Sequence, residues 1–442
     1  MDIKLSDHFT YKRLFRFVLP SIFMMIFTSV YGVVDGFFVS NYAGKTPFAA
    51  VNLIMPVPML LGAFGFMIGT GGTALVSFTL GEGKEKRARE YFSLLVYVTI
   101  VVGFVLTVLG IIFMEPVAYF LGARDKMLTY CVQYGRILTI SLIPFMLQIM
   151  FQSFLISAER PAFGLVVTVA AGVANIVLDY LLIAVLDGGI IGAALATSIS
   201  QFIGGFIPLI FFMRKNGTPL YLTKTKLYLR ALGRSCFNGA SELMTNISMS
   251  LVNMLYNIQL LKFAGENGVA AYGVIMYANF VFVSIFLGYS IGTAPIIGYN
   301  YGASNKKELK NVFKKSIIFN IVSGILMLVL AILLADTLSR IFVGYDKDLF
   351  DMTKTAFVIY SISFVFAGLN IYASSFFTAL GNGFVSAVIS FLRTLLFQTI
   401  AVLILPLLLG LNGIWLAIVA AEIMALVVAI AFTVKNKKRY GY

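Results

Sequence analysis

The chain has 442 residues, of which 60% are hydrophobic and only 12% are charged. Soluble domains carry about 25% charged residues, so the composition excludes an ordinary soluble enzyme and indicates a protein that crosses a membrane many times. The net charge of +14 does not make nucleic acid an expected partner, because the basic residues are spread over the segments that separate apolar stretches.

Apolar segments long enough to span a bilayer recur along the whole chain. In the first half we expect helices near residues 15–39, 52–79, 91–113, 131–156, 162–185 and 190–213. In the second half we expect them near residues 236–261, 271–297, 316–334, 353–377, 384–409 and 413–434. The predicted fold class is an all-α polytopic membrane protein with twelve transmembrane helices.

Lys and Arg residues are distributed unequally between the two sides of these segments. Twenty-four lie on the side that carries both termini, and seven lie on the opposite side. Because basic residues accumulate in cytoplasmic loops, we expect a multi-pass protein of the plasma membrane, the inner membrane of a bacterium, with both termini in the cytoplasm.

The two halves of the chain are related by an internal repeat. A shift of 221 residues aligns 43–92 with 264–313 without a gap and gives ten identities, Gly81 with Gly302 among them. Six spans per repeat place both halves in the same orientation, related by an axis along the membrane normal. We expect an N-lobe at 1–213, a cytoplasmic connector at 214–235 and a C-lobe at 236–442, with a central cleft between two pseudo-symmetric six-helix lobes.

Two aspartates interrupt apolar spans of the first half. Asp35 lies in the first span, Asp179 lies in the fifth with Asn175 one turn earlier, and Thr197 lies in the sixth. Counted from the outer ends of their spans, Asp35, Asp179 and Thr197 all lie about 9–12 Å deep. Intramembrane carboxylates usually face a cavity and have a function, so we expect a cation site for H⁺ or Na⁺. The alternative is that unrelated helices satisfy each aspartate separately.

Further polar residues mark the spans of the second half. The seventh span carries a stripe that faces either the substrate cleft or a neighbouring helix; its members are Glu242, Asn246, Asn253 and Asn257. Arg393 and Glu422 either pair with each other or contact substrate. In the first span, Pro20 is either a passive kink or a hinge that responds to Asp35.

Other kinds of chemistry lack the residues they need. His8 is the only histidine, and Cys131 and Cys236 have neither zinc nor disulfide spacing. The glycine-rich stretch 69–72 has no preceding strand and no Walker lysine, so close helix packing explains it. We therefore expect no cofactor and no enzymatic activity, and energy from an ion gradient.

Four motifs together resemble the multidrug and toxic compound extrusion (MATE) family over essentially the whole length. They are VVDGFF at 33–38, the Asn-x3-Asp pattern from Asn175 to Asp179, GIIGAALAT at 189–197 and PIIGYNYG at 295–302. The resemblance implies two six-helix lobes and an N-lobe cation site made by Asp35, Asn175, Asp179 and Thr197. It also implies export of organic cations and drugs in exchange for Na⁺ or H⁺.

Two positions are notable against that family pattern. Some members bend the first helix at a proline fifteen residues before its aspartate, and Pro20 stands at that interval. Members that bind a cation in the C-lobe use acids on spans seven and ten, but here the tenth span offers only Asn370 in the substrate cleft. This departure argues against a second ion site.

The sequence therefore predicts an alternating-access antiporter for small organic cations, which works as a monomer in the bilayer. The nearest alternative is a flippase for lipid-linked oligosaccharides or lipids, which would need arginines in the cleft for pyrophosphate. A non-transporting membrane scaffold or receptor would have no need of carboxylates at matched depth.

Overall fold

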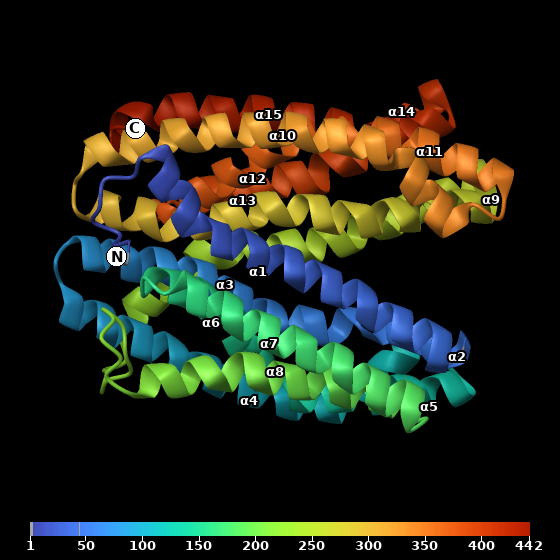
Figure 1. Ribbon diagram of the computed structural model, residues 1–442, viewed down its shortest axis with the longest axis horizontal. Helices are drawn as coiled ribbons and strands as arrows, with labels where there is room; N and C mark the ends of the chain where they lie inside the picture. Colours follow the sequence, from blue (N-terminus) through green and yellow to red (C-terminus); the bar gives the residue numbers. More distant parts are fainter. Residues whose placement is uncertain (1–2, 44) are drawn as a thin grey trace.

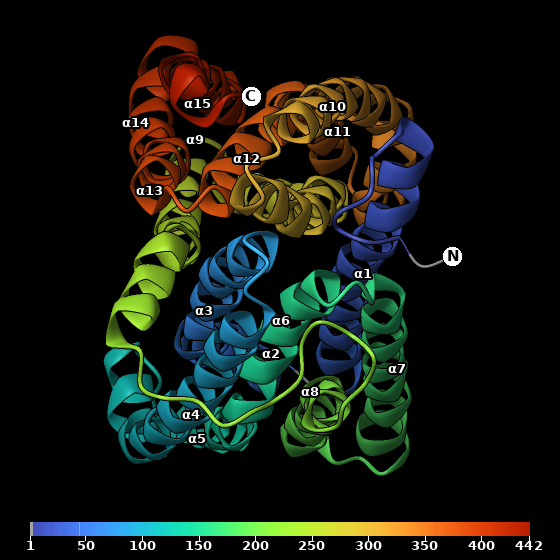
Figure 2. The ribbon, with the colours of Figure 1, turned by 90° about the vertical axis from the view of Figure 1, so that its left-hand side faces the viewer.

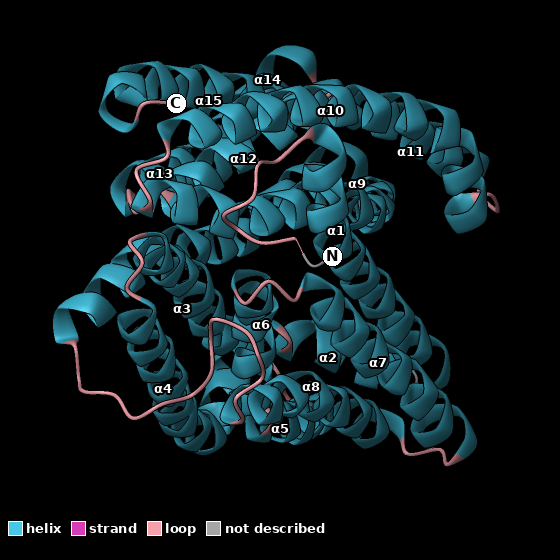
Figure 3. Ribbon diagram, turned by 60° about the vertical axis from the view of Figure 1, so that its left-hand side comes forward, coloured by secondary structure: helices cyan, strands magenta, loops and turns pink. Residues whose placement is uncertain are grey.

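The computed structural model describes residues 3–43 and 45–442, and all regular structure in this part of the chain is helical (Figures 1 and 3). The first half contains α1 (Tyr11–Phe38), the π-helix η1 (Val39–Ala43), α2 (Lys45–Ile54), α3 (Pro56–Gly81), α4 (Glu85–Phe120), α5 (Asp125–Ile140), α6 (Leu142–Ser157), α7 (Pro161–Asp179), the π-helix η2 (Tyr180–Val185) and α8 (Gly189–Met213). The second half contains α9 (Leu229–Gly302), α10 (Lys306–Val343), α11 (Lys347–Ser361), α12 (Phe364–Ala379), α13 (Gly383–Phe391), the π-helix η3 (Leu392–Leu396), α14 (Phe397–Leu409) and α15 (Leu411–Tyr440).

These helices make twelve spans, which confirms the predicted fold class. Within the described residues, nine helices are long and apolar enough to cross a membrane, and two bent pairs bring the number to eleven. The bent pairs are α5 with α6, at 54°, and α11 with α12, at 47°. The twelfth span arises within α9, because Gly265 has φ 60° and ψ −150° and breaks the helix there. Only glycine adopts this conformation readily.

Each half of the chain has its own hydrophobic core, and the halves form two groups of helices in Figure 1. Two clusters of buried residues lie between Val39 and Leu220, and a third lies between Val252 and Val419. A fourth cluster joins the first part of α1 to the second half, with Phe17 and Val18 beside Ile296 and Val312. Helix α1 therefore packs on both groups.

The 221-residue repeat recurs in the contacts between the halves. A methyl group added at Gly81 would overlap the carbonyl oxygen of Tyr299, and one added at Gly302 would overlap that of Phe78. Both partners are related by the same shift of 221. The same shift relates the contact between Gly71 and Gly239 to the contact between Gly292 and Val18. In both contacts a helix of one half packs closely on a helix of the other. Small residues allow backbones to approach in this way within membranes.

The helix of the seventh span begins earlier than the sequence predicts. No helix is present from 214 to 228, and α9 begins at Leu229, seven residues before the expected start of the seventh span. The polar character of Arg230 and Arg234 hides these first two helical turns from a hydropathy scan. The non-helical part lies along α4, where the backbone N–H of Thr223 donates to Ser93 Oγ at 2.9 Å. The two termini and this connector lie at one end of the molecule (Figure 2), called the termini end below.

Candidate functional site: an acid pair beside a central cavity

The structure brings Asp35 of α1 and Asp179 of α7 together inside the first half. Asp35 is 8% exposed and Asp179 is 0% exposed, and the two carboxylates are near enough to act on each other electrostatically. Thr197 of α8 joins them, because its hydroxyl lies 3.5 Å from Asp35 Oδ1. Three helices from separate parts of the sequence therefore meet at one point.

The polar side-chain atoms that α7 contributes to this site are not satisfied by the protein. Neither oxygen of Asp179 has a hydrogen-bond partner among the described residues, and neither side-chain atom of Asn175 has one. Both side chains are buried on α7, one turn apart. None of the ion pairs between described residues involves Asp35 or Asp179. A buried polar group without a partner costs about 1–3 kcal/mol, and more if it is charged, so the arrangement fits a bound cation or proton.

The helices that carry the acids change their winding next to them. η1 follows Asp35 by four residues, and η2 starts directly after Asp179. Within the described residues the third π-helix is η3, which contains Arg393. A π-helical turn takes an additional residue and rotates the side chains around it, and such turns are frequent at functional sites. Each of the three lies at or near a charged residue within a span.

Sequence reasoning missed two tyrosines around the acid pair. Tyr31 lies one turn before Asp35 on α1, a spacing that could have identified it. Tyr134 of α5 is fully buried and lies within the electrostatic influence of both Asp35 and Asp179. No pattern in the sequence connects α5 to α1 and α7, because only tertiary packing brings them together.

A cavity of about 370 Å³ lies between the two halves. Its first-half wall comes from α1, α3 and α6, with Met25, Ser29, Thr70 and Gln152 among its residues. Its second-half wall is built mainly from α9, α12 and α15 together with η3. Met25 and Ser29 lie on the same helix as Asp35, which follows Ser29 by six residues, or about 9 Å of helix.

The polar stripe of the seventh span faces this cavity over most of its length. Glu242, Asn246 and Asn253 line the cavity, and Tyr272 donates its hydroxyl hydrogen to Asn253 Oδ1 at 2.8 Å. Asn257 is exposed and is not among the lining residues. Asn370 of α12 is fully buried behind the wall.

Arg393 and Glu422 form an ion pair in the cavity wall. Nη2 of Arg393 lies 2.8 Å from Glu422 Oε1, and Nε donates to both carboxylate oxygens at 2.9 and 3.0 Å. Asn370 Nδ2 donates to Glu422 Oε2 at 2.6 Å and to the backbone oxygen of the same residue at 2.9 Å. Arg393 also acts electrostatically on Glu242, whose side chain has no ion-pair partner among the described residues.

Toward the termini end, the backbones of α3 and α9 pack closely against each other. On α3 the lining residues stop at Thr73, and Gly81 beyond them meets Tyr299. On α9 they start at Glu242, and Gly239 before them meets the backbone of Met67. The two halves are therefore in close contact through α3 and α9 on this side of the cavity.

The described residues hold no cluster of three or more His, Cys, Asp or Glu side chains that could bind a metal ion. The acid pair offers oxygen ligands only, which suit H⁺ or Na⁺ better than a transition metal. Pro20 lies within α1, which continues as a helix on both sides of it. Its ring nitrogen cannot donate the hydrogen bond that a helix interior normally contains at this position.

Comparisons with known proteins agree with this fold. The MatE family model matches twice, over residues 20–181 and 243–404. The multidrug export protein MepA of Staphylococcus haemolyticus is 25% identical over 97% of this chain and 94% of its own. A MATE family transporter solved in an outward-facing conformation has a TM-score of 0.92 at 21% identity, with 97% of this chain and 96% of the other covered. The Vibrio cholerae MATE transporter VcmN, solved as a mutant, has a TM-score of 0.89 at 21% identity, with 97% of both chains covered. This chain therefore belongs to the multidrug and toxic compound extrusion family of membrane transporters.

Proposed function

We propose that this protein is a secondary-active antiporter that exports organic cations and drugs in exchange for Na⁺ or H⁺ by alternating access. The observation that carries the proposal is the buried pair of Asp35 and Asp179: neither oxygen of Asp179 has a hydrogen-bond partner among the described residues, and Asp35 lies on α1, a helix that also lines the cavity. An ion bound at the pair and a substrate bound in the cavity would act on the same helix, α1.

The acid pair is suited to an ion that binds and leaves in every cycle. Two carboxylates in a poorly solvated site repel each other, so a bound H⁺ or Na⁺ relieves a repulsion that the protein does not relieve by itself. For Na⁺, oxygens of Asp35, Asn175, Asp179 and Thr197 would serve as ligands, and water could complete the shell. For H⁺, one shared proton would be sufficient.

The cavity is suited to an organic cation of drug size. Its volume of about 370 Å³ falls within the range of about 300–1,000 Å³ that small-molecule sites occupy. Because Arg393 and Glu422 neutralise each other, the acidic group left over in the cavity lining is that of Glu242. Phe280 and Met276 add aromatic and thioether surfaces, which adapt to varied apolar cations. The relative MepA is named as a multidrug exporter.

Exchange requires that each ligand prefers a different state of the transporter. In the proposed cycle a cation from outside binds Asp35 and Asp179, favours return to the inward-facing state, and lowers the affinity for substrate. Substrate taken from the cytoplasm or the inner leaflet drives the opposite stroke. Pro20 would be the point at which α1 changes its shape, since no backbone hydrogen bond holds the helix there.

We propose that the termini end faces the cytoplasm, because 24 Lys and Arg residues accumulate on that side. The present state would then be closed to the cytoplasm, like the outward-facing relative. The moving bodies would be the lobes 1–213 and 236–442, tethered by the connector in a monomer. Residues 1, 2 and 44 of the N-lobe lie outside the described part of the chain.

The flippase alternative has less support. Recognition of a pyrophosphate would need guanidinium groups that are free to bind it. Arg393 already binds Glu422. Arg136 donates to the backbone oxygen of Ile111 at 3.2 Å and lies 3.8 Å from Glu115. Neither is therefore free in this state.

The proposal is tested with purified protein in liposomes, with ethidium inside and Na⁺ and H⁺ gradients imposed separately. We expect efflux with one of the two gradients, and we expect Asp35→Asn and Asp179→Asn each to abolish the ion-driven component. Asp336→Asn is the matched control, because Asp336 is an exposed acid of α10 that pairs with Lys354 and Arg340.

Full ion-driven efflux in Asp35→Asn, at normal amounts of folded protein, would disprove the proposed role of the acid pair. Efflux in the parent that responds to neither gradient would disprove antiport itself. The control variant separates these outcomes from a general effect of removing a negative charge.

A further inference from the structure

The residues before α1 form an ordered segment that contacts both halves of the transporter. This segment, residues 3–10, is called the N-terminal strap here. It is non-helical and contains a turn in which Asp7 N–H donates to the backbone oxygen of Lys4 at 3.1 Å. Leu5 is 1% exposed and Phe9 is 0% exposed. A terminal segment is usually poorly ordered unless something ties it down, so its burial needs an explanation.

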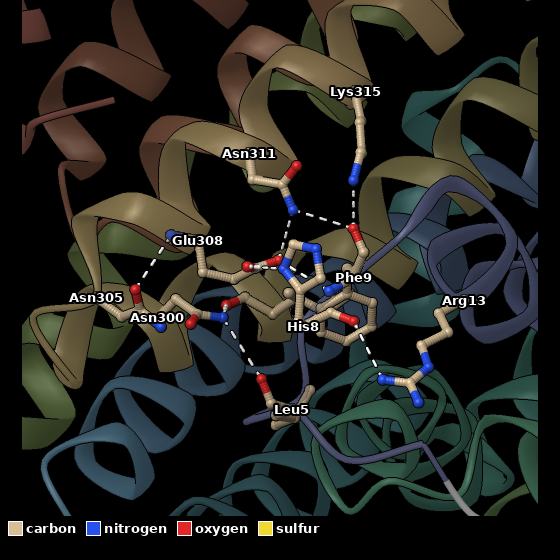
Figure 4. Close-up of polar contacts among 10 residues, drawn as sticks. Leu5, His8, Phe9, Arg13, Asn300, Asn305, Glu308, Asn311 and Lys315 are labelled. Atoms are coloured by element: carbon tan, nitrogen blue, oxygen red, sulfur yellow. Dashed lines mark hydrogen bonds and ion pairs between the residues drawn. The ribbon is translucent and has the colours of Figure 1, made fainter.

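The second half of the chain holds the strap through α10 (Figure 4). Glu308 Oε1 accepts the backbone N–H of Phe9 at 2.9 Å, and Glu308 Oε2 lies 2.7 Å from His8 Nδ1. The backbone oxygen of Phe9 accepts from Asn311 Nδ2 at 3.0 Å and also from Lys315 Nζ. Both the N–H and the C=O of one strap residue are therefore bonded to the C-lobe.

Most hydrogen-bond partners of the Glu308 side chain belong to the strap rather than to α10. The Glu308 side chain is 7% exposed, and an acid this deeply buried needs partners. It accepts from Asn311, three residues further along α10, at 2.8 Å, and its other two partners, His8 and Phe9, belong to the strap. Without the strap this carboxylate would lose most of its hydrogen bonds.

In the first half of the chain, the turn between α6 and α7 holds the strap, in addition to Arg13 of α1, whose Nη1 donates to the backbone oxygen of His8 at 3.4 Å. Glu159 lies in the turn between α6 and α7. Its Oε1 accepts a hydrogen bond from the backbone N–H of Leu5 at 2.8 Å. On the other side of the same residue, Asn300 Nδ2 of α9 donates to the Leu5 oxygen at 3.5 Å. Leu5 therefore bridges the two lobes, with Glu159 on one side and Asn300 on the other.

The strap lies at the end where the lobes meet. Asn300 is next to Tyr299, whose carbonyl oxygen is in close contact with Gly81 of α3. If the lobes separate here, Glu159 moves away from Glu308, and the strap cannot remain bonded to both. The strap has several hydrogen bonds to α10 and one to the turn between α6 and α7, so the Leu5–Glu159 bond is the one expected to break.

We propose that the N-terminal strap is a latch that stabilises the state closed at the termini end, and that opening of this end requires release of Leu5 from Glu159. The inference rests on the proposed alternating access. Weakening either anchor should raise the population of the state open at the termini end, because the strap favours the closed state only while both anchors hold it.

The test measures access to the closed interface rather than transport. Ser77 of α3 is fully buried, with its Cβ 3.2 Å from the position of a methyl group built on Gly298 of α9. The background is the full chain with Ser77→Cys and with Cys131→Ala and Cys236→Ala, in nanodiscs. The rate at which a water-soluble maleimide labels residue 77 then reports opening at this end. Thermal melting of each variant checks that it is folded.

We expect Glu159→Ala to raise the labelling rate by about 10- to 150-fold, the effect of losing a hydrogen bond to a charged group. Glu308→Ala should raise it similarly, and combining the two should add little, because a strap released at one anchor no longer latches. Glu82→Ala is the matched control: Glu82 lies at the same end and pairs with Lys84 instead. Its rate should equal that of the parent.

An unchanged rate in Glu159→Ala would overturn the latch, and so would an equal increase in Glu82→Ala or full additivity of the two strap variants. Should Glu308→Ala fail to fold, Glu159→Ala and Glu82→Ala still decide. Failure of the proposed function is a different result, namely the absence of ion-driven efflux from parent liposomes, and it does not depend on the labelling rates.

Discussion

The glycines between α3 and α9 give a prediction whose size follows from their geometry. In Gly81→Ala the added methyl would overlap the Tyr299 oxygen and lie 2.9 Å from its carbonyl carbon. The obstacle is main chain in both helices, so a change of side-chain rotamer cannot relieve it. The two lobes must therefore move apart where they now touch.

Overpacking of this kind typically costs about 1–3 kcal/mol, and occasionally more. Since 1.4 kcal/mol changes an equilibrium tenfold, the state closed at the termini end should lose a factor of about 5 to 150 against the open state. Gly302→Ala should behave alike, because the repeat gives it the same overlap, with the Phe78 oxygen. The double variant should cost less than the sum, because one separation of the lobes makes room for both methyl groups.

The assay combines thermal melting in detergent with ethidium efflux from liposomes. Gly233→Ala is the matched control, because a methyl group there meets no atom within 4 Å. We expect Gly81→Ala and Gly302→Ala to slow efflux at least fivefold while Gly233→Ala leaves it unchanged. If both interface variants melt and transport like Gly233→Ala, close backbone contact at this end does not control the balance of states.

Three further predictions concern the site. Thr197→Ala should raise the ion concentration for half-maximal efflux about three- to tenfold, the value of one ordinary hydrogen bond, whereas Thr197→Ser should not. Equal ion dependence of efflux in Thr197→Ala and the parent would contradict the role of this hydroxyl. Arg393→Met should destabilise the fold by about 3–5 kcal/mol, because Glu422 is left buried without its partner, and adding Glu422→Gln should restore much of the melting temperature; a double variant no more stable than the single one would contradict this explanation. Asn253→Ala should change the KM for ethidium several-fold and Asn257→Ala should not, since of these two residues only Asn253 lines the cavity. Equal changes of KM in the two variants would show that the cavity does not select the substrate.

Much of the architecture could be predicted from the sequence because each span is a long apolar run. The meeting of Asp35 with Thr197 also follows from their equal depth, which the helix rise converts from residue counts into distance. Position around a helix is harder to predict over many turns. From Glu242 to Asn257 the stripe turns by about 60°, and this rotation accompanies the exposure of Asn257.

Other features have no local signal at all. Tyr134 reaches the acid pair only through the packing of α5, and the strap is a polar stretch until Glu159 and Glu308 bind its backbone. A backbone group that finds its partner 154 residues away, or 299, leaves no periodicity to detect.

The exchange of first helices between the halves has a consequence for the ancestry of this fold. The start of α1 packs on Gly292 in the second half, and its repeat counterpart, the start of α9, packs on Gly71 in the first. Each half thus leaves a groove that the leading helix of the other fills. A single half, made as a separate polypeptide, would present both the helix and the groove. Two copies could therefore form a symmetric dimer about the axis along the membrane normal, each helix filling the groove of the other copy. The chain has the organisation expected of such a dimer fused end to end, and only its first half has acids at this pair of positions, since the shift of 221 residues leads to Tyr256 and Ile400.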